Sequence, residues 1–176
     1  DLALDLLPDL EGLRVSVGVE GSGRKVLAKQ LLKLNGITEN NTNLLSHGYK
    51  DAADMLLHKK LDAAIFVTTH RAPYILQLMD TRSVTLMGLE RAKAYALRYH
   101  YLHVLTVPEG VIDFARNIPP RDVTLVAPTA QLVARSDLHP ALVGLLLQAA
   151  KEVHHAGLGF EKEGEFPSPK YVDFDL

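Results

Sequence analysis

The chain has 176 residues, which is enough for one well-buried core and lies within the usual size of a single domain. Its composition, 47% hydrophobic and 23% charged, is typical of a folded globular protein, and a net charge of −2 gives no electrostatic attraction to nucleic acid. Cysteine is absent, which excludes disulfides and cysteine-bound metals, and the apolar runs are too short to span a bilayer.

The first part of the sequence predicts alternating strands and helices, because apolar runs of strand length alternate with apolar residues at helical spacing. We expect strands at 13–19, 42–45, 62–68 and 83–87, and helices at 25–35, 50–60, 72–79 and 90–99. Alternation at these lengths implies right-handed crossovers. The predicted fold class is therefore α/β, a mostly parallel sheet of about four strands with helices on both faces.

The pattern changes after His100. We expect a strand at 102–107, an irregular excursion with a short helical turn at 112–115, strand-like pieces at 122–126 and 130–134, and a helix at 139–154. We accordingly divide the chain into a linker at 1–12, an α/β lobe at 13–107, a crossover segment with returning strands at 108–138, and a C-terminal helix with an irregular tail at 139–176.

A glycine-rich turn joins the first predicted strand to the first predicted helix. Free backbone N–H groups and the positive end of the helix dipole converge at such a turn, and together they bind anions. The glycine spacing is not that of a P-loop, a dinucleotide fingerprint or a nucleophile elbow. Two interpretations remain: a cradle for a carboxylate or small oxyanion, or a turn that only reverses the chain. The cradle would consist of Gly21, Ser22, Gly23 and Arg24.

The predicted topology points to further ligand-binding residues, because loops after parallel strands share one edge of the sheet. The loop after the third predicted strand has Thr68, Thr69 and His70, and Tyr101 precedes a later strand. The eight histidines lack a metal-binding spacing, and no hydrolase motif surrounds Ser22. We therefore predict no metal, no cofactor and no catalytic residue.

Several longer motifs resemble one known protein family. They are the run from Leu10 to Arg24 (Leu-Glu-Gly-Leu-Arg-Val-Ser-Val-Gly-Val-Glu-Gly-Ser-Gly-Arg), the run 52–67, the run 101–110, and 122–129 with the following 132–138. In this order and spacing they resemble the solute-binding subunits of tripartite TRAP transporters of the TAXI type. The resemblance extends over most of residues 10–155.

This resemblance implies a periplasmic-binding-protein type II fold, of which the chain would be the second lobe and the returning C-terminal segment. It implies a small organic anion, such as an amino acid or a dicarboxylate, bound between two lobes that close by hinge motion. It also implies a periplasmic or otherwise extracytoplasmic protein, membrane-anchored in its full-length form, with membrane permease subunits as partners. Arg24 stands where the family usually has threonine.

Two functions of other classes remain open at this point. One is a small α/β enzyme that uses Ser22 or a histidine, and the other is a ligand-sensing domain. We also expect a single lobe to bind its solute more weakly than a two-lobed protein, because it offers only one wall. A dimer of the fragment is expected as a way to cover its apolar face.

Overall fold

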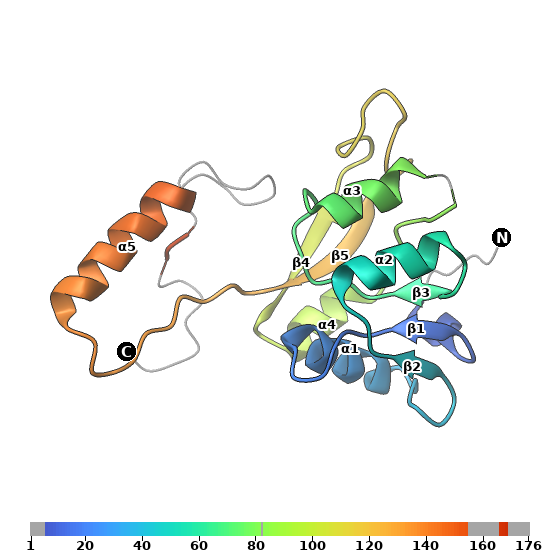
Figure 1. The fold of residues 1–176 in the computed structure, drawn as a ribbon, viewed down its shortest axis with the longest axis horizontal. Coiled ribbons are helices and arrows are strands. Elements are labelled where there is room, and N and C mark those ends of the chain that lie inside the picture. Colours follow the sequence, from blue (N-terminus) through green and yellow to red (C-terminus); the bar gives the residue numbers. More distant parts are fainter. Residues whose placement is uncertain (1–5, 82, 155–165, 169–176) are drawn as a thin grey trace.

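The structure, a computed structural model, describes residues 6–81, 83–154 and 166–168. Figure 1 shows a body with two sheets and a C-terminal helix that stands apart from it. The elements are the 3-10 helix η1 (Leu7–Leu10), strands β1 (Arg14–Ser16), β2 (Asn43–Leu45), β3 (Ala63–Ala64), β4 (Leu102–Val107) and β5 (Val123–Pro128), and helices α1 (Gly23–Leu34), α2 (Tyr49–Leu57), α3 (Pro73–Asp80), α4 (Ala92–Arg98) and α5 (Pro140–His154).

The first sheet is parallel and has the strand order β2-β1-β3. Val15 of β1 lies opposite Leu44 on one side and Ala63 on the other. Because β2 and β3 flank β1, right-handed crossovers place α1 and α2 on opposite faces of the sheet. The predicted α/β fold with a parallel sheet and helices is confirmed, and the carboxyl ends of all three strands meet at one edge.

Two hydrophobic clusters cover the two faces of this sheet. On the α1 side, Val15 and Val17 pack with Leu32, and Tyr95 of α4 and Leu102 of β4 complete the cluster. The other cluster joins α2 to α3 and includes Ala53, Leu78 and Met79. Leu7 and Leu10 of η1 are also buried in the first cluster, within the segment that we expected as a linker. Since both faces are covered, the only polar opening toward a ligand is expected at an edge.

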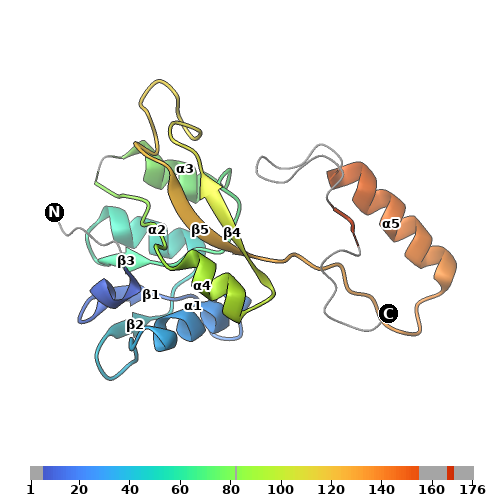
Figure 2. The ribbon, with the colours of Figure 1, turned by 180° about the vertical axis from the view of Figure 1, so that it is seen from behind.

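The second sheet is an antiparallel ribbon of β4 and β5, seen from behind in Figure 2, with α4 packed against both strands. The predicted strands at 102–107 and 122–126 are confirmed, and β5 continues to Pro128. The strand predicted at 130–134 is wrong. The Thr129 N–H donates to the Tyr101 carbonyl (2.8 Å), one residue before β4 begins, so the chain beyond has no strand beside it to pair with.

The fourth strand predicted at 83–87 is also wrong, because the described residues of this segment pair with neither sheet there. Their alternating pattern reports burial instead: Val84 and Leu86 pack with the α2–α3 cluster, and Met87 with the α1 cluster. The alternating apolar pattern therefore indicates an extended segment that contacts both hydrophobic clusters. Such a segment need not form hydrogen bonds with a neighbouring strand.

The excursion after β4 contains a tight turn in place of the helical turn predicted at 112–115. The N–H groups of Ile112 and Asp113 both donate to the Ile118 carbonyl (2.9 and 3.1 Å), and the Ile118 N–H donates back to Asp113 (2.9 Å). Arg116 at the tip forms ion pairs with Asp113 (2.7 Å) and with Asp80 of α3 (2.6 Å). These contacts attach the excursion to the end of α3.

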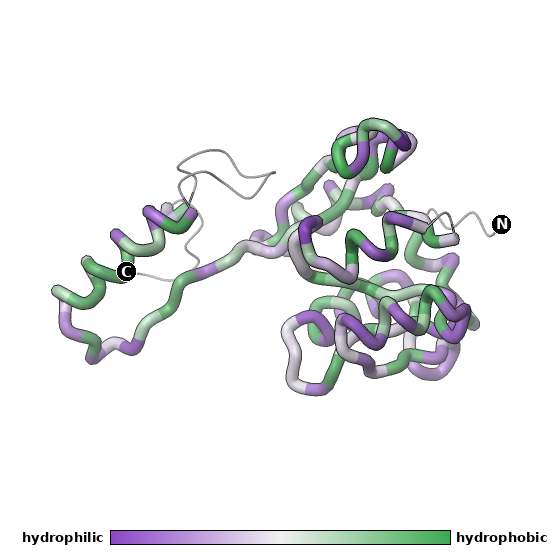
Figure 3. The backbone as a smooth tube through the Cα atoms, turned by 45° about the horizontal axis from the view of Figure 1, so that its top comes forward, coloured by the Kyte–Doolittle hydropathy of each residue, from purple (hydrophilic) through white to green (hydrophobic). Residues whose placement is uncertain are grey.

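Helix α5 confirms the helix predicted at 139–154, and both ribbon views place it apart from the body. None of its residues is classed as buried, although hydrophobic residues occur along its length (Figure 3). Most of the predicted irregular tail after it lies outside the described residues. Among the described residues, no helix is both long and apolar enough to cross a membrane.

An ion pair fastens the first strand to the third. Arg14 donates from Nε and from a terminal nitrogen to the two oxygens of Asp62 (2.9 and 2.7 Å), and its backbone N–H donates to Asp62 as well (2.8 Å). Because Asp62 directly precedes β3, this pair of side-chain hydrogen bonds from Arg14 to Asp62 sets the register in which β3 joins β1. The hydrogen bonds from Arg14 lower the pKa of Asp62 from 3.8 to about 2.

Replacement of this carboxylate is expected to remove an acid-sensitive part of the stability. The depressed pKa of Asp62 stabilises the folded state fully above its unfolded pKa, and the stabilisation is lost as the pH falls from about 4 toward 2. Both side chains are partly solvent-exposed, so we expect Asp62→Asn to cost about 1 kcal/mol at neutral pH. Urea unfolding at pH 7 and at pH 2.5 measures this. An equal cost at both pH values would contradict the assignment.

Candidate functional site

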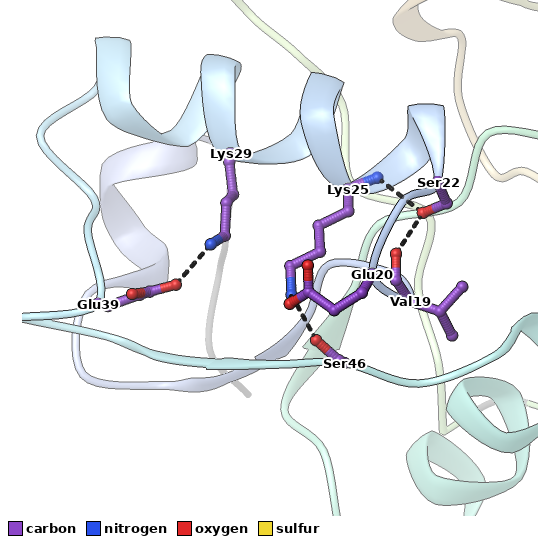
Figure 4. Close-up of polar contacts among 7 residues, drawn as sticks. All are labelled: Val19, Glu20, Ser22, Lys25, Lys29, Glu39 and Ser46. Carbon is purple, nitrogen blue, oxygen red and sulfur yellow. Dashed lines mark hydrogen bonds and ion pairs between the residues drawn. The ribbon is translucent and has the colours of Figure 1, made fainter.

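Ser22 fixes the start of α1. Its Oγ accepts a hydrogen bond from the Lys25 N–H (3.2 Å) and donates to the Val19 carbonyl (2.7 Å), as Figure 4 shows. The hydroxyl thus has the role of a helix cap, which typically contributes about 1 kcal/mol. Within the described residues no histidine is hydrogen-bonded to it, so the structure gives Ser22 no base to activate it as a nucleophile.

The charge of Lys25, next on the same helix, is already paired. Its ammonium group contacts Glu20 and donates to Ser46 Oγ (2.7 Å), and the adjacent pair of Lys29 and Glu39 lies along the same side of α1 (Figure 4). Glu20 and Glu39 have lowered pKa values because of these lysine hydrogen bonds. The charges of Lys25 and Lys29 are therefore both balanced by nearby carboxylates.

Arg24 is different, because its charge is buried and has no acidic partner among the described residues. The residue is 5% exposed, and its guanidinium lies over the ring of Tyr49, 4.3 Å from the ring centre. One terminal nitrogen donates to the His47 carbonyl, while the other, NH1, is buried without a hydrogen-bond partner. Burial lowers the pKa of Arg24, but an arginine remains protonated at neutral pH. The site therefore contains a desolvated cation that lacks a counter-charge among the described residues.

Three stacked aromatic rings support this guanidinium. Tyr49 opens α2, Phe66 follows β3 and Tyr74 lies in α3, so three separate elements bring the rings together. The ring centres of Tyr49 and Tyr74 are 5.3 Å apart, and those of Tyr49 and Phe66 are 6.2 Å apart. The Tyr49 hydroxyl donates to the Val67 carbonyl (2.7 Å), which fixes the plane of the ring under Arg24. These rings were not predicted as site residues. Tyr49 lies in the predicted loop between 42–45 and 50–60, and Phe66 lies near the end of the strand predicted at 62–68, so their nearness to the predicted ligand edge was the available indication.

Gly18 leaves space for the Arg24 side chain on the side away from the Tyr49 ring. Its φ of +107° lies in the region that favours glycine, and a Cβ at this position would lie 2.4 Å from Nε of Arg24. The residue thus combines two requirements, an unusual backbone angle and the close approach of a side chain. Of the glycines in the turn, Gly18 is therefore the one whose missing side chain sets the geometry of the site.

Two more buried polar atoms lack partners near the same edge of the sheet. They are Oγ of Ser16, at the end of β1, and Nδ1 of His47, just after β2. Arg24 contacts the His47 backbone, and side chains at alternate positions place Ser16 on the same side of its strand as Gly18. Buried polar groups in proteins nearly always have a partner. Their gathering at a strand edge is typical of a site for a polar ligand.

A pocket of about 420 Å³ opens beside Arg24. It lies between α1 and the ribbon of β4 and β5, and Tyr101 OH bridges the two by donating to Oε1 of Gln30 (2.8 Å). Burial raises the pKa of Tyr101, so its hydroxyl remains neutral at physiological pH. The lining residues are Gly23, Arg24, Val26, Leu27, Gln30, Tyr49, Val67, Tyr101 and Pro128.

The eight predicted ligand-binding residues divide between this pocket and its surroundings. Gly23, Arg24 and Tyr101 line it, whereas Gly21 and Ser22 lie just before α1 and do not. The others belong to the loop after β3. Thr68 Oγ1 lies 2.7 Å from the Tyr74 hydroxyl, at the outer ring of the stack, and Thr69 Oγ1 accepts from the Arg71 N–H (3.4 Å). His70 is half-buried in the same loop. A direct role of these residues in binding stays a prediction.

Comparison with known protein families identifies the family of the chain. Residues 3–155 match the NMT1-like family, and the match spans most of the chain. The chain belongs to this family. The NMT1-like family is periplasmic-binding-protein-like, so membership supports a solute-binding protein of a typically extracytoplasmic type, whose partners are in general a solute and a transporter. No curated protein matches the sequence.

The close approach of Gly18 and Arg24 can be tested with a pair of alanine substitutions. Gly36 also has a positive φ (+79°), but a Cβ there meets open space, so Gly36→Ala is a matched control for backbone strain. We expect both variants to lose about 1 kcal/mol of stability. Only Gly18→Ala should also move the guanidinium off Tyr49, which NMR detects as loss of the ring-current shift at the Arg24 side chain. An unchanged Arg24 signal in Gly18→Ala would contradict this geometry.

Proposed function

We propose that the chain is the solute-binding component of a TRAP-type importer of the TAXI type. It binds a small organic anion at the pocket beside Arg24 and delivers it to membrane permease subunits. The carboxylate of the solute pairs with the Arg24 guanidinium. In this proposal the protein works outside the cytoplasm and acts by binding, without catalysis.

One observation supports this proposal above the others, namely the buried NH1 group of Arg24 that has neither a hydrogen-bond partner nor a counter-charge among the described residues. A buried donor without a partner costs about 1–3 kcal/mol, and more when it is charged. A carboxylate ligand offsets this cost, because it supplies both the negative charge and the acceptor. The N-terminus of α1 adds its dipole and its free N–H groups at the same place.

The surroundings of Ser22 favour binding over hydrolysis. Both hydrogen-bonding directions of its hydroxyl are used by the cap of α1, and family membership supports a binding protein. A cap holds the helix start in place, which positions Arg24 two residues later. Ser22 therefore contributes to the proposed site as a positioning residue.

Arg24→Gln tests the proposed function. We expect small carboxylates to raise the thermal unfolding temperature of the unmodified chain and their primary amides to leave it unchanged. In Arg24→Gln the affinity for carboxylates should fall at least about tenfold, because the positive charge and the two parallel N–H donors of the guanidinium are removed. The stability of the unliganded variant should change by no more than about 1 kcal/mol, since relief of the buried charge offsets the lost contact with Tyr49.

Lys29→Gln is the matched control, because it removes a positive charge from the same helix at an exposed ion pair outside the pocket. Carboxylate binding by this variant should equal that of the unmodified chain. If amides bind as well as carboxylates, or if Arg24→Gln keeps full affinity, the proposal is wrong.

A further inference from the structure

The walls of the pocket beside Arg24 are apolar. Val26 and Leu27 come from α1, Val67 follows β3, and Pro128 ends β5. The rings of Tyr49 and Tyr101 fill the remaining sides. Burial of apolar ligand surface against such walls contributes about 25 cal/mol per Å². The body of the ligand therefore gains affinity from hydrocarbon surface.

Both tyrosine hydroxyls and the amide oxygen of Gln30 in this lining already have partners. The Tyr101 hydroxyl donates to Gln30 Oε1, and the Tyr49 hydroxyl donates to the Val67 carbonyl. Arg24, by contrast, has a terminal nitrogen, NH1, that is buried without a hydrogen-bond partner among the described residues. The pocket thus offers one ionised side chain, and the neutral Nε2 amide of Gln30 is the side-chain donor that its walls leave for a second polar group.

The charges of the lining residues also favour a ligand with a single charged group. Arg24 is the single ionised side chain among them, and none is acidic. The adjacent Lys25 is not available as a second cation, because it contacts Glu20 and Ser46 on another side of α1 (Figure 4). The second carboxylate of a dicarboxylate, or the ammonium group of an amino acid, would lose its water without gaining an ionised partner. That loss costs several kcal/mol if the group becomes fully buried.

We infer that the pocket takes a monocarboxylate with an apolar body, and that it discriminates against dicarboxylates and amino acids. This inference rests on the proposed function, since it assumes that Arg24 binds a carboxylate. It narrows the class of ligand implied by the sequence resemblance, which included amino acids and dicarboxylates. The carboxylate lies at Arg24 and the apolar body lies along Val26, Leu27 and Pro128.

Four probes of equal carbon-chain length separate the possible outcomes: hexanoate, adipate, norleucine and hexanamide. Binding of each to the chain is measured by isothermal titration calorimetry at the same pH and ionic strength. We expect hexanoate to bind at least about tenfold more tightly than adipate or norleucine, and hexanamide to bind more weakly than hexanoate by a similar factor.

The outcomes that oppose these expectations are distinct. If adipate or norleucine equals or exceeds hexanoate, the inference is overturned while the carboxylate site at Arg24 stands. If no carboxylate binds, or if hexanamide equals hexanoate, the proposed function itself fails. Circular dichroism of the sample establishes that the chain is folded in either case.

A substitution in the wall provides an independent test. Val26 lines the pocket and is 66% exposed, so a longer polar side chain there is tolerated by the core. Val26→Lys supplies a second cation and should shift the preference toward adipate by at least about threefold relative to Val26→Gln. The same preference in both variants would overturn the placement of the ligand body along α1.

Discussion

The desolvated charge of Arg24 is the interaction on which the site depends. Arg24 is 5% exposed, so its charge is stable only if its surroundings compensate for the lost water. An aromatic face and one backbone carbonyl do so in part. The remaining group, NH1, has no such compensation. The neighbouring features follow from this cation: a glycine beside it, stacked rings beneath it and a capped helix start that directs its side chain.

The parallel sheet explains why these features can meet. Residues 18, 47 and 66 lie far apart in the sequence, yet each follows a strand of the β2-β1-β3 sheet, and parallel strands deliver their carboxyl ends to one edge. The ion pair between Arg14 and Asp62 acts at the opposite ends of β1 and β3. The fold thus separates a structural ion pair, in which both charges are satisfied, from the cation of the proposed binding site, whose NH1 group has no partner among the described residues.

The sequence predicted the local elements better than the contacts between them. Hydrophobic spacing correctly predicts α1, α2 and the ribbon strands, because it reports which face is buried. The same spacing fails at 83–87, where Val84 and Leu86 face one core and Met87 the other without strand pairing. Arg24 was predicted as a binding residue from its place at a helix start, but its partners Tyr49 and Phe66 were not, since they meet it only through the tertiary fold. Ser22 was correctly placed at the turn, but its hydroxyl is used by the backbone.

The hydrogen bond between Tyr101 and Gln30 links the two walls of the pocket, because Tyr101 directly precedes β4 of the ribbon and Gln30 lies in α1. Both groups are uncharged, so salt does not screen the bond and it persists across the pH range in which the tyrosine stays protonated. The contact that links the two walls is therefore uncharged. The pocket width at this contact is independent of ionic strength, whereas the attraction of an anion toward Arg24 weakens as salt is added. The effect of pocket shape on ligand binding can therefore be separated from the effect of charge by varying only the salt concentration of the buffer.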